Sequence, residues 1–426
     1  MLDFNEQLTH LRQRIATIDR KYSTPVERPQ AHPRREHHEG ARFFIEEWSE
    51  GQVVENEFGP HFQTERLFAS HKQYGAADIG ALSHLPENLL DALGDRQIPS
   101  VPPQRWAFLD TETTGLMGNS GAYAFLIGVG RITQQGFRVR QFFMREYAEE
   151  GSVLAALNAH LDDFDVLITY NGKSYDQPLL ETRYRIARHQ APFGRLGHLD
   201  LLHGARRLWK LRLEGCRLMQ LEEQILGVYR EGDLAGELIP YVYFEYLRSR
   251  EAQRLVPIFH HNALDILTLA CLTAIVPAAF GSTDSDSLER AGIRRGEDLA
   301  GIARWLLATH EHEAALELFK RAVDAGLPDR LLFCTLWQIA LLEKKLQRPH
   351  AALQVFTELG GSRNDYRVNA LEELAKHYEH EESNYALALE FTRQAFSHAP
   401  SAALLNRKTR LERRLAKARL PKTVRS

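Results

Sequence analysis

Two carboxylates stand two residues apart at the end of an apolar stretch, in the sequence FLDTETTGL (Phe108–Leu116). The preceding run WAFL predicts a buried strand. Side chains at positions i and i+2 of a strand point to the same side, so Asp110 and Glu112 are expected to project toward one spot. Two carboxylates in one place repel each other unless a proton or a cation lies between them. Because oxygen ligands suit hard divalent cations such as Mg²⁺ or Mn²⁺, the pattern predicts a metal site.

Two further acids belong to predicted helices. Asp176 lies in YNGKSYDQPLL, which follows a buried strand and opens a helix, where the helix dipole favours an anion. Its alternative is an ordinary helix-start role. Asp265 lies in FHHNALDILTL, four residues after His261, so the two share a helix face if the helix includes both. His260, five residues before Asp265, is the competing partner for a catalytic role.

The segment from Arg105 to Val276 supplies the elements that would position these acids. WAFLD, AYAFLIGVGRI and FRVRQFFM are rich in β-branched and aromatic residues and are separated by Gly-containing turns, which predicts three antiparallel strands. A helix (EEGSVLAALNAHLDDF), a buried strand (VLITY), a helix after NGKS and a short strand (HLDLL) follow. This order is that of an α/β ribonuclease-H-like fold, a mixed sheet flanked by helices.

The rest of the chain is expected to be helical. GSTDSDS predicts a linker, and beyond it Phe319, Phe356 and Phe391 recur in similar helical stretches 37 and 35 residues apart. This period suits tetratricopeptide-like (TPR-like) repeats, although the full consensus is not met, and an unrelated helical bundle is the alternative. The predicted organisation is an N-terminal helix and flexible linker (1–40), an extension of the nuclease domain (41–100), the ribonuclease-H-like domain (101–280), a linker (281–287), TPR-like repeats (288–405) and a basic tail (406–426).

Composition indicates a multidomain globular protein. The chain has 426 residues, of which 44% are apolar and 26% charged. We find no uninterrupted apolar run of about 18 residues and no signal-peptide pattern at the start, which predicts a cytoplasmic protein without a membrane partner. Cys216, Cys271 and Cys334 are far apart and form no CxxC pair, which argues against disulfides and a cysteine zinc site.

The net charge of the chain does not indicate nucleic-acid binding, but two local runs of basic residues are compatible with it. The net charge of −3 is not that of a basic protein. One basic run includes Arg206, Arg207, Lys210, Arg212 and Arg217. The other is the C-terminal stretch Arg407–Arg425, with Glu412 as its only acid. Each run is equally compatible with a solvated helix face.

In their order and contexts, the four acids resemble those of the DEDD superfamily of 3′→5′ exonucleases, which are built on a ribonuclease-H-like fold. DTETTGL, AFLIGVG, YNGKSYDQPLL, IPYVYFEYLRS and HNALDILTL resemble more closely the YprB-like group of ribonuclease-H-like proteins. Some members of that group are similar to this chain in carrying TPR-like repeats at the C-terminus. The resemblance covers about residues 41–276 well and the repeats loosely.

The resemblance implies a two-metal mechanism, in which two Mg²⁺ or Mn²⁺ ions would be held by Asp110, Glu112, Asp176 and Asp265. Members use either a Tyr four residues before the last Asp or a His five before it, and this chain has His261 and His260 at these two positions. We favour His261 as general base, because HNxxD resembles the closer group. His260 is the alternative.

Other residues of these motifs are candidates for substrate binding. Thr113 lies where the first strand turns away, and a backbone amide there could meet a substrate group. Asn171 and Tyr175 are expected to shape the site or contact the terminal nucleotide, and Lys173 to meet a phosphate as a point charge. A purely structural role is the alternative for each. Asp200, at the end of HLDLL, is expected to cap a turn and is left out of the site.

The main hypothesis is a metal-dependent 3′→5′ exonuclease acting on single-stranded DNA or RNA 3′ ends, with the repeats as a docking platform for a protein partner. A structure-selective endonuclease on the same fold is one alternative. A catalytically inactive scaffold that binds nucleic acid or protein is the other. A third hypothesis, compatible with the exonuclease, is that the basic tail itself binds nucleic acid and supplies processivity.

Overall fold

The structure is a computed structural model that describes residues 45–93, 98–115, 121–281 and 284–419. The chain divides into two compact units, Met1–Phe43 and Phe44–Ser426. The first unit lies outside the described residues, and with it the N-terminal helix and linker predicted at 1–40. The last residues of the predicted basic tail, 420–426, also lie outside them.

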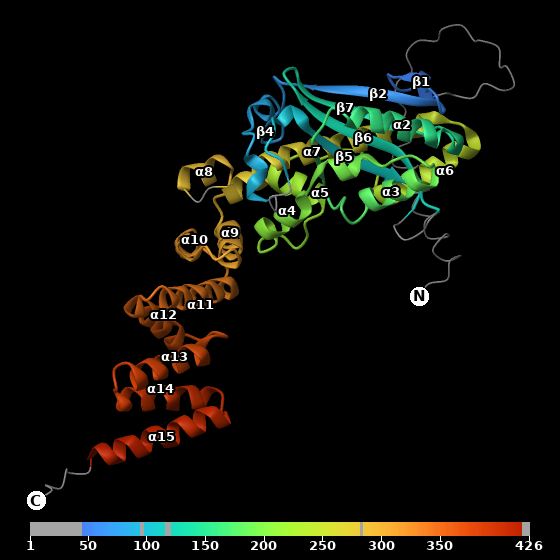
Figure 1. Cartoon of the computed structure of the whole chain (residues 1–426). Helices are drawn as coiled ribbons and strands as arrows, with labels where there is room; N and C mark the ends of the chain where they lie inside the picture. Colours follow the sequence, from blue (N-terminus) through green and yellow to red (C-terminus); the bar gives the residue numbers. More distant parts are fainter. Residues whose placement is uncertain (1–44, 94–97, 116–120, 282–283, 420–426) are drawn as a thin grey trace, which may run out of the picture. The chain divides into compact units, whose positions relative to one another are not determined.

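A seven-stranded mixed sheet forms the core of the α/β region (Figure 1). Its order is β1-β2-β7-β6-β5-β8-β9. The three predicted hairpin-linked strands, β5, β6 and β7, are antiparallel neighbours, while β8 and β9 run parallel to β5. This is the predicted ribonuclease-H-like fold. The strands are β1 (Gln52–Asn56), β2 (Gly59–Ala69), β5 (Trp106–Thr113), β6 (Ala124–Thr133), β7 (Gly136–Phe143), β8 (Val166–Thr169) and β9 (Gly197–Asp200).

The segment predicted as an extension contributes to this sheet. β2 pairs with β7 along its length and β1 pairs with β2, both antiparallel, so the sheet gains two strands at one edge. A separate two-stranded ribbon follows, made of β3 (Gln73–Tyr74) and β4 (Ala77–Asp78). Short 3₁₀ turns complete the segment: η1 (Ile45–Glu47), η2 (Gly80–His84), η3 (Leu89–Ala92) and η4 (Pro103–Arg105).

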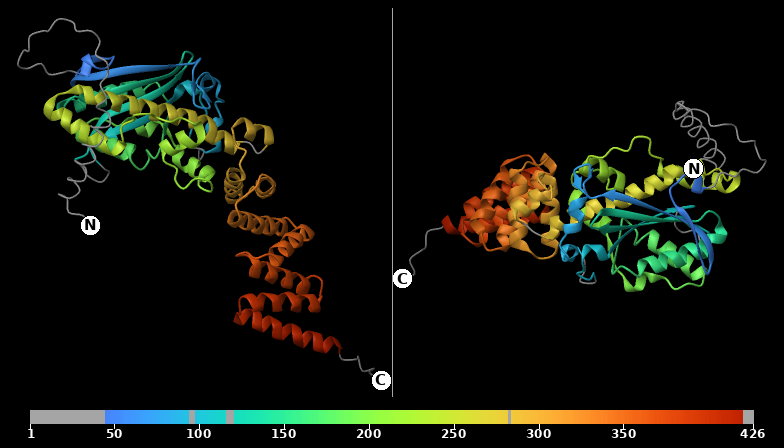
Figure 2. Two further views of the ribbon diagram at one scale, coloured as in Figure 1. Left: turned by 180° about the vertical axis from the view of Figure 1, so that it is seen from behind. Right: turned by 90° about the horizontal axis from the view of Figure 1, so that it is seen from above.

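Helices cover both faces of the sheet (Figure 2). Trp106 and Phe108 of β5 pack in a cluster with α7 and α4, while Ala107 and Leu109 pack in a second cluster with α2, α3 and α6. A strand buried on both faces reads as a continuous apolar run, which explains the sequence WAFL. The helices are α2 (Glu150–Leu161), α3 (Asp176–Ile186), α4 (Leu201–Trp209), α5 (Leu218–Leu221), α6 (Ile239–Ser249) and α7 (Val256–Gly281), with short turns η5 (Tyr147–Glu149), η6 (Pro192–Arg195), η7 (Glu222–Leu226), η8 (Gly236–Leu238) and η9 (Ala252–Leu255).

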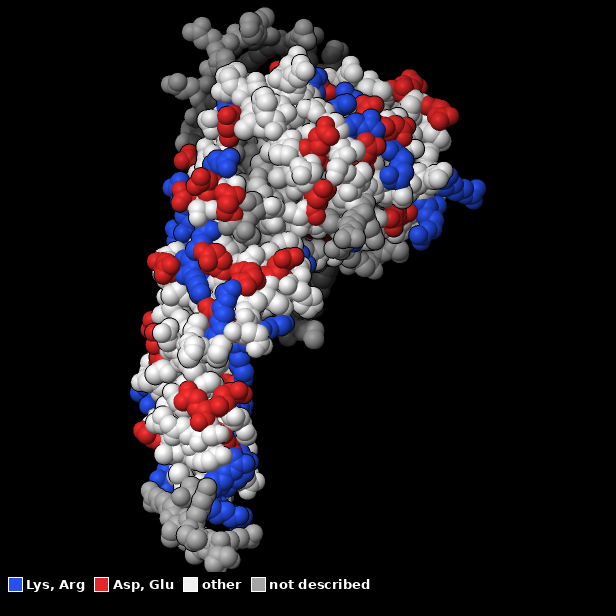
Figure 3. Space-filling view, turned by 60° about the vertical axis from the view of Figure 1, so that its left-hand side comes forward, with Lys and Arg blue, Asp and Glu red and all other residues white. Residues whose placement is uncertain are grey.

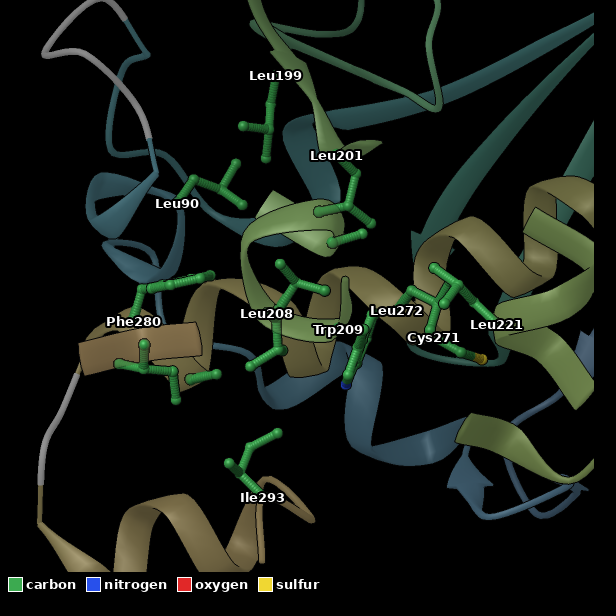
Figure 4. Close-up of a cluster of buried hydrophobic side chains, with 14 of the residues drawn as sticks. Leu90, Leu199, Leu201, Leu208, Trp209, Leu221, Cys271, Leu272, Phe280 and Ile293 are labelled. Carbon is green, nitrogen blue, oxygen red and sulfur yellow. The ribbon is translucent and has the colours of Figure 1, made fainter. Parts of the chain in front are cut away.

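The longest helix, α7, crosses one face of the sheet. Among the described residues, the segment Ala252–Gly281 is long and apolar enough to span a membrane by length and composition, yet 78% of its most apolar window is buried inside the structure. Figure 4 shows Leu272 and Phe280 among buried leucines, with Trp209 of α4 in the same cluster. We therefore interpret α7 as a core helix, which passes the same composition test.

The C-terminal region is all-α, as predicted. From α9 to α15 each helix packs on the next in sequence, and Phe319 and Phe356 are buried. Whether these helices form TPR-like repeats stays a prediction. The helices are α8 (Ser285–Arg290), α9 (Gly296–Ala308), α10 (His312–Asp324), α11 (Asp329–Lys345), α12 (Pro349–Gly361), α13 (Arg367–His380), α14 (Tyr385–His398) and α15 (Ala402–Arg419).

Two predicted boundaries differ from the structure. Helix α8 begins inside the predicted linker 281–287, because the Asp284 carboxylate accepts from the backbone N–H of Ser287 at 2.9 Å and caps a helix there. The predicted boundary at 405/406 falls inside α15, which buries Leu404 and Leu411 against its neighbours. Much of the stretch predicted as a basic tail therefore belongs to α15, the last described helix of the C-terminal region.

Ion pairs occupy part of both basic runs. Arg410 donates two hydrogen bonds, of 2.9 and 2.8 Å, to the buried carboxylate of Glu379. Arg212 donates to the buried Asp298 at 2.9 Å. On the face shown in Figure 3, Lys and Arg side chains alternate with Asp and Glu side chains along the helical region. These arginines contribute to packing, which leaves fewer of them free for nucleic acid.

Candidate active site

The four predicted acids come from three elements that meet at the carboxyl ends of β5 and β8. Asp110 and Glu112 lie on β5, Asp176 is the first residue of α3, and Asp265 lies within α7. Burial, followed by the charges of Asp265 and Asp176, raises the pKa of Asp110 well above its usual value. Burial and the charges of the other three acids likewise raise the pKa of Glu112. The four carboxylates therefore lie within electrostatic range of one another.

Asp176 is attached to β5 by a hydrogen bond. The Thr111 hydroxyl donates to Asp176 Oδ1 at 2.5 Å, which holds the start of α3 against the strand that carries Asp110 and Glu112. Burial raises the pKa of Asp176 to about 6, although the Thr111 hydrogen bond lowers it. Carboxyl groups with a pKa this far above the usual value are concentrated at functional sites.

Asn262 of α7 orients Asp110 by packing over a row of three residues across the sheet. Asp110 on β5 lies opposite Gly128 on β6, which lies opposite Gln141 on β7. Asn262 of α7 fills the space over Gly128: its Nδ2 donates to Asp110 Oδ2 at 2.9 Å, and its Oδ1 accepts from Gln141 Nε2 at 2.8 Å. A Cβ at position 128 would lie 2.2 Å from Asn262 Oδ1. The glycine thus allows α7 to bring Asn262, and Asp265 one turn later, close to β5.

The two candidate histidines face different surroundings. His261 is buried, with Nδ1 at 2.8 Å from Asp233 Oδ2 and Nε2 at 3.5 Å from Asp265 Oδ2. Burial would lower the pKa of His261, but the hydrogen bond with Asp233 and the charges of Asp265 and Asp233 outweigh it, so the pKa is raised. His260 is exposed and accepts from Arg66 Nη1 at 2.6 Å. His261 therefore lies next to one of the four acids, and its role as general base stays a prediction.

Sequence reasoning missed two residues of the site, Asp233 and Arg230. The Arg230 guanidinium is almost fully buried and lies 2.6 Å from Asp265 Oδ1, 2.8 Å from Glu222 and 3.2 Å from Asp233. Tyr74 donates to the same Glu222 carboxylate. Both missed residues lie in the stretch VYREGDLAGE between η7 and α6, which has no periodicity and matches none of the motifs quoted above. Only their three-dimensional neighbours reveal them.

The predicted substrate-binding residues lie around the start of α3 and the end of β5. Asn171 adopts a left-handed backbone (φ 67°), and its N–H donates to Asp200 Oδ1 at 2.7 Å. Asp200 also accepts from the N–H of Lys173 at 3.2 Å and of Leu202 at 3.1 Å, which is the predicted turn and capping role. The side chains of Lys173 and Tyr175 are exposed.

Thr113 has a local structural contact. Its hydroxyl donates to the backbone oxygen of Gly115 at 3.0 Å, where the pairing of β5 with β6 becomes irregular. The register of β5 against β6 shifts after Glu112, and the strand ends at Thr113. This places the Thr113 backbone at the rim of the acid cluster, where a role in substrate binding stays a prediction.

The acid cluster suits hard divalent cations. In the ranges that the structure describes, no three His, Cys, Asp or Glu side chains are grouped as ligands of a single metal ion. However, the donors are all carboxylate oxygens, which Mg²⁺ and Mn²⁺ prefer. Burial and the charges of neighbouring acids raise the pKa of both Asp110 and Glu112, although the Asn262 hydrogen bond and the charge of Arg230 offset part of the effect on Asp110. Arg230 pairs with Asp265, so a cation would relieve chiefly the other three acids.

Asp233 is expected to position His261, so Asp233→Asn should lower kcat by about 10- to 100-fold with little change in nucleic-acid affinity. The Asn oxygen can still accept one hydrogen bond but lacks the charge that fixes the imidazole. Asp298→Asn is the matched control, because it also breaks a buried Asp–Arg contact but lies away from the acids. Steady-state kinetics and binding of a labelled oligonucleotide measure both. An equal loss of kcat in the two variants would contradict the role.

Comparison with known proteins identifies the family to which this fold belongs. Residues 107–276 match the family model of the RNase_H superfamily. The uncharacterized protein YprB of Bacillus subtilis (strain 168) is 32% identical over 296 residues, which are 68% of this chain and 69% of that protein. The matched family segment begins one residue after the start of β5 and ends within α7, so it contains all four acids. The chain therefore belongs to the ribonuclease H superfamily, in the same family as YprB.

Proposed function

We propose that this protein is a metal-dependent 3′→5′ exonuclease that hydrolyses phosphodiester bonds of DNA or RNA. Membership of the ribonuclease H superfamily supports nuclease activity in general. The single observation that carries the proposal further is the convergence of Asp110, Glu112, Asp176 and Asp265 from β5, α3 and α7, with the pKa of the first three raised. Carboxylates with a purely structural role are seldom placed this close together, because the charge of each destabilises the charged form of the others.

Each residue of the cluster has a proposed role. Asp110, Glu112, Asp176 and Asp265 would hold Mg²⁺ or Mn²⁺, which supply charge neutralisation at the phosphate and activation of the attacking water. His261 would accept the proton of that water at Nε2. With Nδ1–H donated to Asp233, the lone pair of the neutral imidazole lies on Nε2, the nitrogen that faces Asp265. His260, held by Arg66, is assigned no catalytic role.

A catalytically inactive scaffold is the second candidate, and one observation favours it. Arg230 lies 2.6 Å from Asp265 and is almost fully buried, so a fixed positive charge already occupies part of the place that a cation would take. In an inactive member of the superfamily, such an arginine would make the metal unnecessary. The other three acids, Asp110, Glu112 and Asp176, have no basic partner within hydrogen-bonding distance among the described residues. For this reason we prefer the nuclease to the scaffold.

The substrate end distinguishes the proposed exonuclease from an endonuclease. We expect a 5′-labelled single strand to shorten through a descending ladder in the presence of Mg²⁺ or Mn²⁺, and a covalently circular strand of the same sequence to stay intact. Both are assayed with DNA and with RNA. Cleavage of the circle as fast as the linear strand would establish the endonuclease. Binding of nucleic acid without cleavage of any strand would favour the scaffold.

A further inference from the structure

A polar cavity of about 610 Å³ lies beside the acid cluster, between α3, α4 and β9. None of the four acids lines it, so it is separate from the proposed metal site. Its cationic lining residues are Lys173, in the loop that leads into α3, and Arg207 of α4. His203, one helical turn before Arg207, adds a further polar group on the same face of α4.

Neither of these two cations has a carboxylate partner in the part of the chain that the structure describes. Among the residues that the structure describes, neither the Lys173 ammonium nor the Arg207 guanidinium has an ion pair, and both side chains are exposed. Other arginines of the α/β region, such as Arg105, Arg183 and Arg230, are paired with carboxylates. Charge left unpaired at a concave surface is the usual footprint of an anionic ligand.

Two acids also line the cavity, but both are engaged. The Asp200 carboxylate accepts three backbone N–H groups, from Asn171, Lys173 and Leu202. The Glu181 carboxylate accepts from the side-chain amide of Gln177 at 2.7 Å. Asp200 therefore stiffens the loop that presents Lys173, whereas the charge of Glu181 opposes an anion in the cavity.

The position of the cavity connects it with the acids. Asp110 lies near the carboxyl end of β5, which pairs with β8, and β8 pairs with β9. Adjacent strands are about 4.8 Å apart, so the end of β9 lies about 10 Å across the sheet from the end of β5. The loop from Asn171 to Tyr175 bridges this gap, with Lys173 on the side of the cavity and Asp176 on the side of the acids.

We infer that this cavity binds a backbone phosphate of the nucleic-acid strand whose end lies among the four acids. The inference rests on the proposed nuclease function and specifies a second contact of its substrate. Lys173 and Arg207 would contact the phosphate oxygens, with Arg207 able to donate two parallel hydrogen bonds. The contact is to the backbone and carries no base preference, so it would hold DNA and RNA strands alike.

The test measures binding without cleavage. The affinity of the full chain for a fluorescein-labelled single strand is measured by anisotropy in EDTA, from about 50 to about 200 mM KCl. We expect the double variant K173Q/R207Q to bind more weakly, and the slope of log K against log salt to fall by about 0.7 per lost contact. Glu181→Gln should strengthen binding by roughly 1.5- to 5-fold, because it removes a like charge.

Arg206→Gln is the matched control. Arg206 is the neighbour of Arg207 on α4 and equally exposed, but it does not line the cavity. Because an exposed charge outside the cavity contributes little, Arg206→Gln should change neither the affinity nor the salt slope measurably. The inference is overturned if K173Q/R207Q keeps the affinity and salt slope of the wild type, or if Arg206→Gln weakens binding equally. In these cases cleavage would still be measurable, whereas a wild-type chain that binds no strand would refute the proposed function as well.

Discussion

Replacing Asp110 by Asn should reduce metal-dependent cleavage by more than about 100-fold, since removal of one charge-stabilising group typically costs about 3–4 kcal/mol in the transition state. The same substitution should leave the fold intact or make it more stable. Burial and the charges of Asp265 and Asp176 raise the pKa of Asp110. The charged form at pH 7 is therefore destabilising, and the neutral amide relieves that repulsion.

Opposite effects on activity and stability are the expected signature of a functional acid cluster. Relief of each kcal/mol of repulsion should raise the melting temperature by about 2–4 °C for a domain of this size. Asp163→Asn is the control, because Asp163 is exposed and pairs with Arg131 at the surface. Rates of strand degradation and thermal melting in EDTA measure the two effects. A variant that loses activity only because it unfolds would refute the account.

Gly128→Ala should destabilise the fold and disturb the site. The added Cβ would lie 2.2 Å from Asn262 Oδ1 and 2.3 Å from Ile266 Cδ1. Asn262 cannot move aside freely, because Gln141 and Asp110 hold it from both sides. We expect a loss of about 1–3 kcal/mol, typical of an overpacked core. Cleavage should fall as well, because displacement of α7 would carry His261 and Asp265 away from β5.

The matched control for this substitution is Gly194→Ala. A Cβ at Gly194 meets nothing within 4 Å and the backbone there is not left-handed, so the change should stay within about 0.5 kcal/mol. Chemical denaturation of the two variants compares them directly. If Gly128→Ala unfolds at the same denaturant concentration as Gly194→Ala, the close approach of α7 to β6 is not what positions the site.

The elements that carry the acids could be predicted from the sequence because each has a strong local pattern. WAFLD, AYAFLIGVGRI and VLITY are apolar runs bounded by turns, and the structure has β5, β6 and β8 at these places. Asp110 and Glu112 follow from the alternation of a strand, and His261 and Asp265 from the period of a helix. Local patterns place each acid on its own element. The expectation that the four acids form one site came from the resemblance of their order along the chain to that of a known family.

Other features could not be predicted because they depend on contacts distant in sequence. The pairing of β2 with β7 joins residues 62–69 to residues 136–143, and no local signal specifies such a partner. Asp233 and Arg230 lie in an irregular stretch, and their role depends on the position of α7. His261 and His260 are adjacent in sequence, and only the packing of α7 shows which of them faces the acids.

Whether the four acids hold metal ions can be measured without knowledge of the natural substrate, by isothermal titration calorimetry of Mn²⁺ binding to the wild type and to Glu112→Gln. We expect saturable binding to the wild-type chain that is weakened at least about 10-fold in Glu112→Gln, as one carboxylate ligand is lost. If the folded wild type bound neither Mn²⁺ nor Mg²⁺ saturably, the four acids would not form a metal site.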